Sequence, residues 1–147
     1  MKKEGLDHTD EAIIKELQRN GRESYKNIAR KLNISDGTVR LRTEKLIQNG
    51  YLKISALINP LYFENSIIAH VGINLKNRAH SEIMEEIAQI EPVISVQNVT
   101  GRYDIVVEIS VNSRKELRKF LVEDLSEIDG ITSTESFICL EAINKWI

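Results

Sequence analysis

Hydrophobic residues recur every three or four positions through the first third of the chain, which is the spacing of amphipathic helices. Residues that commonly cap helices precede each run: Asp7 or Thr9, Ser24 and Ser35. Asn20-Gly21 and Gly50 are typical of helix ends. The pattern predicts three helices, followed by a β-prone stretch over residues 51–58. The residues predicted to face inward are Leu6, Ile13, Ile14, Leu17, Tyr25, Ile28, Ala29, Leu32, Val39, Leu46 and Ile47.

The pattern changes after Asn59-Pro60, which we interpret as a boundary between two domains, 1–58 and 59–147. Beyond it, alternating apolar residues indicate strands and helical spacing indicates helices. The predicted order is strand, helix, strand, strand, helix and strand, over residues 67–75, 81–90, 93–100, 105–111, 113–128 and 131–140. This βαββαβ order is that of the split ferredoxin-like unit, so the predicted fold class is α+β.

Composition excludes several classes of protein. Of the 147 residues, 41% are hydrophobic and 29% are charged, which is typical of a soluble globular chain. One Cys and three scattered His provide neither a disulfide framework nor a metal site. The apolar stretches are too short to span a bilayer, and the residues after Met1 lack the apolar core of a secretion signal. We therefore expect a reduced, cytoplasmic protein without a membrane segment.

The net charge of −2 conceals a difference between the two parts of the chain. The first 60 residues contain twelve Lys and Arg against eight Asp and Glu, a net charge of +4. The rest contains eight against fourteen, a net charge of −6. A basic first part is compatible with a polyanionic partner such as nucleic acid.

The stretch from Asn27 to Arg42 has the pattern of a helix-turn-helix. Ala29 is small enough for two helices to cross, and Asn33 tolerates the positive φ of a tight turn. Ser35 then caps a helix whose first residues are expected to face base edges in a major groove. Arg40 is the natural contact to guanine or phosphate. The predicted DNA-binding residues are Ser35, Asp36, Gly37, Thr38, Arg40, Leu41, Arg42 and Lys45. A plain three-helix bundle, or a helix-turn-helix that contacts protein, would give the same pattern.

Motifs along the whole chain resemble the Lrp/AsnC family of prokaryotic transcription regulators. The first part carries Leu6-Asp7, Asp10, Ile13-Ile14, Leu17, Gly21-Arg22, Ser24-Tyr25, Ile28-Ala29, Leu32, Ile34-Ser35, Thr38-Val39, Arg42, Leu46, Gly50-Tyr51-Leu52 and Asn59-Pro60. The second part carries Val99-Thr100-Gly101-Arg102-Tyr103-Asp104. The resemblance implies a winged helix-turn-helix, a connecting strand and a βαββαβ, ACT-like domain. It also implies homodimers formed through the second domain, further assembly into tetramers or octamers, and an amino acid bound between dimers near the Gly-x-Tyr-Asp turn.

An amino-acid site needs partners for a carboxylate and for an ammonium group. Backbone N–H groups around Gly101 could receive the carboxylate, and Asp104 could pair with the ammonium. Thr132 and Thr134 lie on one face of the last predicted strand, and acids near the end of the preceding helix could favour a cationic side chain. The predicted effector-binding residues are Thr100, Gly101, Arg102, Tyr103, Asp104, Asp124, Thr132 and Thr134. Alternatively, Gly101 only forms a hairpin and Asp104 only braces it.

The sequence therefore predicts a sequence-specific DNA-binding transcription regulator that responds to a small effector, and the resemblance implies that this effector is an amino acid. Its expected partners are double-stranded DNA with two half-sites, an amino acid and further copies of itself, with no membrane. The alternative is an amino-acid-binding regulatory protein whose helix-turn-helix serves protein contacts. We expect neither an enzyme nor a cofactor, because no nucleophile–base pair, phosphate-binding glycine loop or metal ligand set is recognisable.

Overall fold

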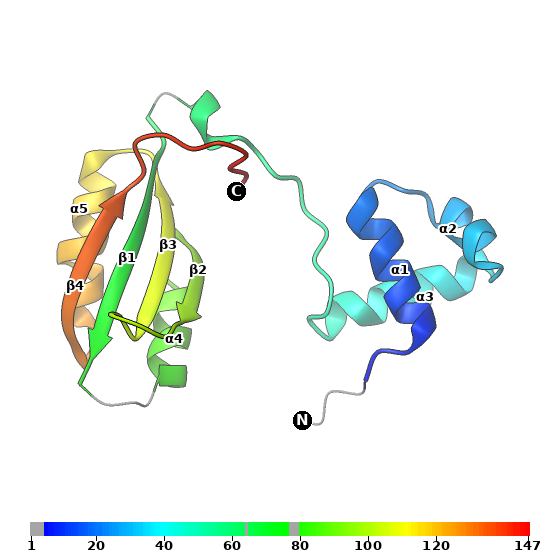
Figure 1. Ribbon diagram of the computed structural model, residues 1–147, viewed down its shortest axis with the longest axis horizontal. Helices are drawn as coiled ribbons and strands as arrows, with labels where there is room; N and C mark the ends of the chain where they lie inside the picture. The colour runs from blue at the N-terminus through cyan, green and yellow to red at the C-terminus, as the bar shows by residue number, and fades with distance from the viewer. Residues whose placement is uncertain (1–4, 64, 77–79) are drawn as a thin grey trace. The chain divides into compact units, whose positions relative to one another are not determined.

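The computed structural model describes residues 5–63, 65–76 and 80–147 (Figure 1). The chain divides into two compact units between Ala56 and Leu57. The expected boundary lay two residues further on, after residue 58. Each unit has its own hydrophobic core, and the two are described separately below.

Helices α1 (His8–Arg19), α2 (Tyr25–Leu32) and α3 (Asp36–Gln48) form the described part of the first unit (Figure 1). Each begins after a residue whose side chain accepts a hydrogen bond from a backbone N–H three positions on: Asp7, Ser24 and Ser35. These bonds satisfy N–H groups that have no partner within the helix. Asn33, between α2 and α3, has a φ of 55°, as predicted for the tight turn of a helix-turn-helix.

The core of this unit contains most of the residues predicted to face inward. Buried there are Ile13, Leu17, Ile28, Ala29, Val39 and Leu46. The predictions for Leu6 and Ile47 are wrong, because these residues are 37% and 44% exposed. Thr43 is buried instead, since positions 39, 43 and 46 follow the helical period on one face of α3, whereas position 47 lies to the side of it.

The connecting strand expected over residues 51–58 is not formed in the single chain. Residues 52–59 carry neither helix nor strand. A strand needs a hydrogen-bonded neighbouring strand. At the end of this segment, Ile58 exchanges two backbone hydrogen bonds with Ile147, at 2.9 and 3.1 Å, which is the pairing of one residue and not of a strand. A short 3₁₀ turn, η1 (Pro60–Tyr62), follows.

Within the described residues of the second unit, four antiparallel strands form one sheet in the order β2-β3-β1-β4. The strands and the helices between them follow the predicted βαββαβ order of a ferredoxin-like fold: β1 (Ile67–Leu75), α4 (His80–Ala88), β2 (Val93–Asn98), β3 (Ile105–Val111), α5 (Arg114–Val122) and β4 (Ile131–Ile138). Helices α4 and α5 cover one face of the sheet (Figure 1), where Ile87 and Phe120 are buried against β1 and β3.

The last helix is shorter than predicted. It was expected to reach Ile128, but α5 ends at Val122 and a 3₁₀ turn, η2 (Asp124–Glu127), follows. The hydroxyl of Ser126 donates to the carbonyl of Glu123 at 2.7 Å, and such local side-chain bonds compete with the regular helix. Leu125 and Ile128 are buried nonetheless, which explains why the hydrophobic pattern continues beyond the helix.

In the part of the chain that the structure describes, no helix is long and apolar enough to cross a membrane.

Candidate nucleic-acid interface and effector site

The start of α3 is exposed and firmly capped. The Ser35 hydroxyl accepts a hydrogen bond from the Thr38 amide at 3.0 Å and lies 2.7 Å from the Thr38 hydroxyl. Asp36 and Gly37 are exposed beside it. The positive end of the helix dipole is at this terminus and favours a neighbouring anion. The predicted contact residues 35–38 therefore lie together at one accessible helix end.

Arg40 and Leu41 are exposed in the next turn of α3. The guanidinium carbon of Arg40 lies 5.8 Å from the centre of the Tyr25 ring, a cation–π contact that joins α3 to the start of α2. Leu41 is 56% exposed, and an apolar side chain in this place can contact the methyl group of thymine. Lys45 is also exposed, one turn further along the helix.

Arg42 is placed differently from the other predicted contacts. Its guanidinium donates to Asp7 at 2.7 Å and to Asp10 at 2.8 Å, and its side chain is only 32% exposed. The pKa of Asp7 is lowered, first by the hydrogen bond from the Asp10 backbone and then by Arg42. The same two carboxylates raise the pKa of Arg42. Arg42 thus joins α3 to the start of α1.

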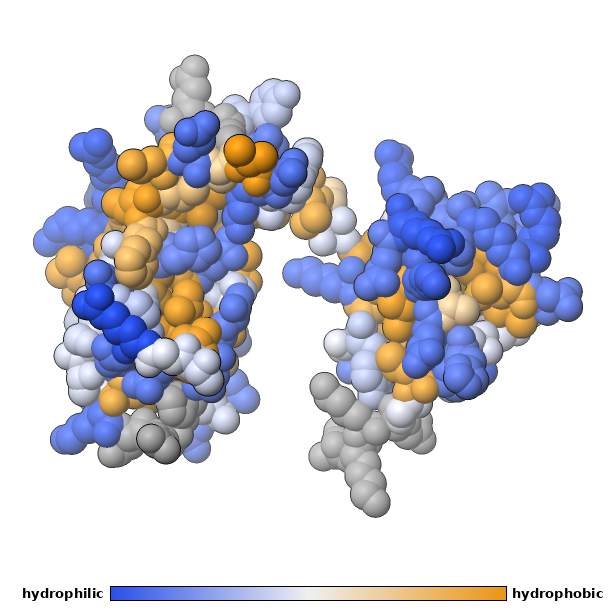
Figure 2. All heavy atoms as spheres, viewed as in Figure 1, coloured by the Kyte–Doolittle hydropathy of each residue, from blue (hydrophilic) through white to orange (hydrophobic). Residues whose placement is uncertain are grey.

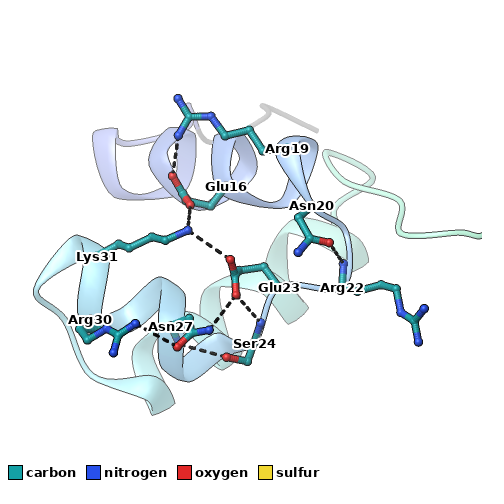
Figure 3. A network of polar contacts seen from close by, with 9 residues as sticks. All are labelled: Glu16, Arg19, Asn20, Arg22, Glu23, Ser24, Asn27, Arg30 and Lys31. Carbon is teal, nitrogen blue, oxygen red and sulfur yellow. Dashed lines mark hydrogen bonds and ion pairs between the residues drawn. The ribbon is translucent and has the colours of Figure 1, made fainter.

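A second cation, Lys31, is held in the same way between α1 and α2 (Figure 3). Its ammonium group lies 2.6 Å from Glu16 and 3.2 Å from Glu23. Glu23 also accepts from the Asn27 side chain at 3.0 Å and from the Ser24 backbone at 3.1 Å. These contacts lower the pKa of Glu16 and Glu23 and raise that of Lys31. The network fixes α2 against α1 and so supports the turn that leads into α3.

In the second unit, Asp104 braces the turn between β2 and β3. Its carboxylate accepts from the Leu75 amide at 2.8 Å, and its own amide donates to Ile73 at 3.0 Å. Thr100 and Gly101 are exposed at the tip of the turn, and Gly101 has a φ of 129°. The contacts of Asp104 are thus those of a residue that braces the turn, and Thr100 and Gly101 lie exposed beyond it.

Tyr103 and Arg102 form a cluster with β4. The Tyr103 hydroxyl donates to the Glu135 carboxylate, and its ring makes an edge-on contact with Phe137 at 6.1 Å between centroids. Arg102 lies 3.1 Å from Glu135 and 5.5 Å from the centre of the Tyr103 ring. Glu135 pairs with Gly72 in the sheet, which places the cluster on the face opposite α4 and α5.

The structure does not bring the remaining predicted effector residues into this cluster. Thr134 pairs with Ile73 and therefore lies on the helix-covered face of the sheet. The hydroxyl of Thr132 donates to the carbonyl of Asn74 at 3.0 Å. Asp124 lies in η2 and pairs with Lys119 at 2.5 Å. The predicted effector-binding residues are thus divided between the two faces of the sheet and the turn η2.

Sequence reasoning missed Tyr25, Gly72, Glu135 and Phe137 as parts of these sites. Two of them had a usable signal, because Glu135 and Phe137 alternate with the Thr row on the last strand and so share the opposite face. Gly72 and Tyr25 had none, since their partners are distant in the sequence. The pairing of Arg42 with Asp7 and Asp10 had none for the same reason.

Each of the two units matches a known protein family. The family model described as "Lrp/AsnC ligand binding domain" matches residues 68–145, and that described as "Winged helix-turn-helix DNA-binding" matches residues 6–53. An uncharacterized HTH-type transcriptional regulator of Pyrococcus abyssi is 39% identical over 142 residues, which cover 96% of this chain and 89% of the relative.

Solved structures share the fold. The leucine response regulatory protein LrpA of Mycobacterium tuberculosis is 25% identical, with a TM-score of 0.79 over 95% of this chain and 96% of that one. A transcriptional regulator of Neisseria meningitidis, solved as an L-Met complex, is 21% identical, with a TM-score of 0.71 over 96% of this chain and 94% of that one.

The matched family models and the name of the relative show a transcription regulator with a DNA-binding helix-turn-helix and a ligand-binding domain. The chain belongs to the Lrp/AsnC family, as its motifs predicted. The family and the names of the relatives indicate regulators and not enzymes.

Proposed function

We propose that this protein binds operator DNA sequence-specifically through α3 and that a free amino acid changes this binding. The observation that carries the DNA proposal is the exposed, capped start of α3, with Arg40 and Lys45 accessible on the following turns. Ser35 and Thr38 are suited to phosphate or base contacts, and Arg40 to guanine. Residues 1–58 are the proposed DNA-binding domain, and residues 59–147 are the proposed effector and assembly domain.

Internal pairing of charges supports the proposal. Asp7, Asp10, Glu16 and Glu23 are engaged with cations of the same unit. Half of the eight acids in the first 60 residues are thus paired with Arg19, Lys31 or Arg42, and the unit presents a surface with a net charge of +4. Such a surface favours a polyanion.

We propose that the effector binds beside the turn that contains Gly101. Thr100 and Gly101 are exposed residues whose backbone N–H groups could receive a carboxylate, and Arg102 adds a positive charge next to them. Glu135, held by Tyr103 and Arg102, offers a negative charge for an ammonium group. An amino acid carries both groups. The L-Met complex of the Neisseria regulator is an example of such a ligand on this fold.

We also propose that the protein acts as a homodimer or a larger homo-oligomer in the cytoplasm. Large apolar side chains are exposed on the second unit, among them Tyr62, Leu140, Ile143 and Trp146. Figure 2 shows hydrophobic residues gathered in patches on the visible face of this unit. Exposed apolar patches commonly mark contacts between subunits. A dimer would present two copies of α3 to half-sites about one helical turn apart, or a multiple of it.

Two titrations test the proposal. Labelled DNA duplexes are first enriched from a random pool by binding to the full chain. The affinity of the protein for these selected duplexes is compared with its affinity for shuffled duplexes, with and without each free amino acid. Calorimetry then measures the binding of each amino acid to the protein without DNA. We expect the protein to bind the selected duplex more tightly than the shuffled one. We also expect one amino acid, or a few related amino acids, to alter this preference. Amino-acid binding without any preference for DNA would support the alternative, a regulatory protein whose helix-turn-helix contacts protein.

A further inference from the structure

Arg42 lies on the same face of α3 as Thr38, Leu41 and Lys45, but its guanidinium is bound to the start of α1. Residues 38, 41, 42 and 45 follow the helical period on this face. They line a groove of about 520 Å³ between α3 and the start of α1, whose other wall includes Asp7 and Asp10. The Arg42 guanidinium is bound to that wall by both carboxylates.

The two carboxylates are themselves fixed by the helix cap. One oxygen of Asp7 accepts from the Asp10 amide at 2.8 Å, and its other oxygen accepts from Arg42. Asp10 repeats the arrangement, with one oxygen toward the Asp7 amide at 3.3 Å and the other toward Arg42. Each carboxylate therefore divides its oxygens between the cap of α1 and the cation on α3, so the acceptors are held in place before Arg42 binds.

The neighbouring cations on α3, Arg40 and Lys45, differ from Arg42 in this respect. In the described residues, no carboxylate lies within ion-pair distance of Arg40 or Lys45, and both side chains are exposed. A guanidinium that is already bound by two charged oxygens must exchange them to reach a phosphate, and it gains little by the exchange.

We propose that Asp7 and Asp10 act as an internal substitute for phosphate, which withholds Arg42 from DNA and uses it to position α3. This inference rests on the proposed function, because it concerns how the same helix meets DNA. Withholding one cation lowers sequence-independent affinity, since each Arg or Lys on a phosphate adds to that term. The contacts that remain, around Ser35 and Arg40, then determine a larger share of binding. Arg42 is thus a positioning residue for the recognition helix.

The test uses the full chain and four variants: Asp7→Asn/Asp10→Asn, Arg42→Met, the triple variant that combines them, and Glu11→Gln. Asn caps helices as well as Asp does, so the double variant removes charge and keeps the cap of α1. Glu11→Gln is the control, because it removes a negative charge from the same helix turn without touching Arg42. Affinity for the selected and the shuffled duplex is measured over a series of salt concentrations.

The double variant is expected to bind the shuffled duplex more tightly, with a log–log salt dependence steeper by about 0.9 per newly contacted phosphate in each chain. Its preference for the selected duplex should fall. The triple variant should return to the wild-type salt dependence, and Glu11→Gln should keep it. Arg42→Met should keep it as well, while binding the selected duplex more weakly because α3 has lost a support.

A salt dependence that becomes shallower in Arg42→Met, on both duplexes, would overturn the inference, because Arg42 would then contact phosphate in the wild-type chain. The salt dependence of Arg42→Met tests the inference even if the double variant folds poorly. A wild-type chain that does not distinguish the two duplexes contradicts the proposed function instead, and the slopes on the shuffled duplex still report on Arg42.

Discussion

The ring of Tyr103 lies directly on the backbone of Gly72. A Cβ at position 72 would stand 2.6–2.7 Å from three atoms of that ring, closer than side-chain carbons approach one another. Gly72 in β1 therefore allows the turn residue Tyr103 to lie on the sheet and reach Glu135 on β4. The absence of a side chain at one position determines where the proposed effector cluster forms.

Gly72→Ala is expected to destabilise the second unit by about 1–3 kcal/mol, because the ring must move out of its packed place. Denaturant unfolding of the full chain measures the loss. The matched experiment places the same change in a Tyr103→Leu background, where a smaller side chain leaves room and the cost should be smaller. An equal cost in both backgrounds would mean that the ring is not what the new methyl group meets.

Gly101→Ala is expected to abolish the response to the effector. The φ of 129° is rarely adopted by residues with a side chain, and such strain costs about 1–3 kcal/mol. Space is not the obstacle, since no atom lies within 4 Å of the added methyl group. Operator binding should largely survive, because the first unit is untouched. Gly5→Ala, at an open position, serves as the control. A wild-type response in Gly101→Ala would place the effector away from this turn.

Arg40→Ala is expected to weaken binding to the selected duplex by about 1–3 kcal/mol if the residue contacts a base. Tyr25→Leu should show part of this loss, because it removes the ring on which the guanidinium rests. Fluorescence anisotropy of labelled duplex gives both values. Lys15→Ala, which removes one exposed cation from α1, controls for the change in net charge. Equal effects of Arg40→Ala and Lys15→Ala would remove Arg40 from the list of specific contacts.

Lys31→Met is expected to lower the free energy of unfolding of the first unit only within a range of pH, because the ion pairs of Lys31 contribute to stability only while all partners are charged. The pKa values of Glu16 and Glu23 lie below their ordinary 4.5, so their contribution is present above 4.5 and is lost as the pH falls through the lowered values. The pKa of Lys31 lies above its ordinary 10.5, so its contribution is present below 10.5 and is lost as the pH rises through the raised value.

Thermal unfolding of wild type and Lys31→Met across this range checks the window. The two proteins should differ most near neutral pH and converge in acid, once both glutamates are protonated. Arg19→Met is a suitable comparison, because Arg19 pairs with Glu16 at the surface and leaves the contact between α1 and α2 intact. A difference that persists unchanged in acid would show that the Lys31 side chain matters through packing and not through charge.

Local signals in the sequence were sufficient for most of the fold. Ser24 and Ser35 were identified as caps, and Asn33 as the turn residue, because each acts on its immediate neighbours. Strand β3 has the predicted bounds, since its alternation is complete. The end of α5 was missed because the Ser126 hydroxyl competes with the helix while the apolar pattern continues.

The candidate sites were less accessible to prediction. Exposure of the start of α3 followed from the helical period. The partners of Arg42 lie 32 and 35 residues away, and Tyr103 and Glu135 are separated by 32 residues, so no local pattern reports these contacts. The strand expected over residues 51–58 depends on a hydrogen-bonded neighbour, which a local pattern does not report either. Contacts between distant residues become visible only once the units are folded.

The comparison of selected and shuffled duplexes in a salt series tests the central claim, DNA recognition by α3, most directly. The account predicts that the full chain binds the selected duplex about a thousandfold or more tightly than the shuffled one, that affinity falls steeply with salt, and that Arg40→Ala removes much of the preference. Equal affinity for both duplexes, or a preference that Arg40→Ala leaves intact, would contradict it.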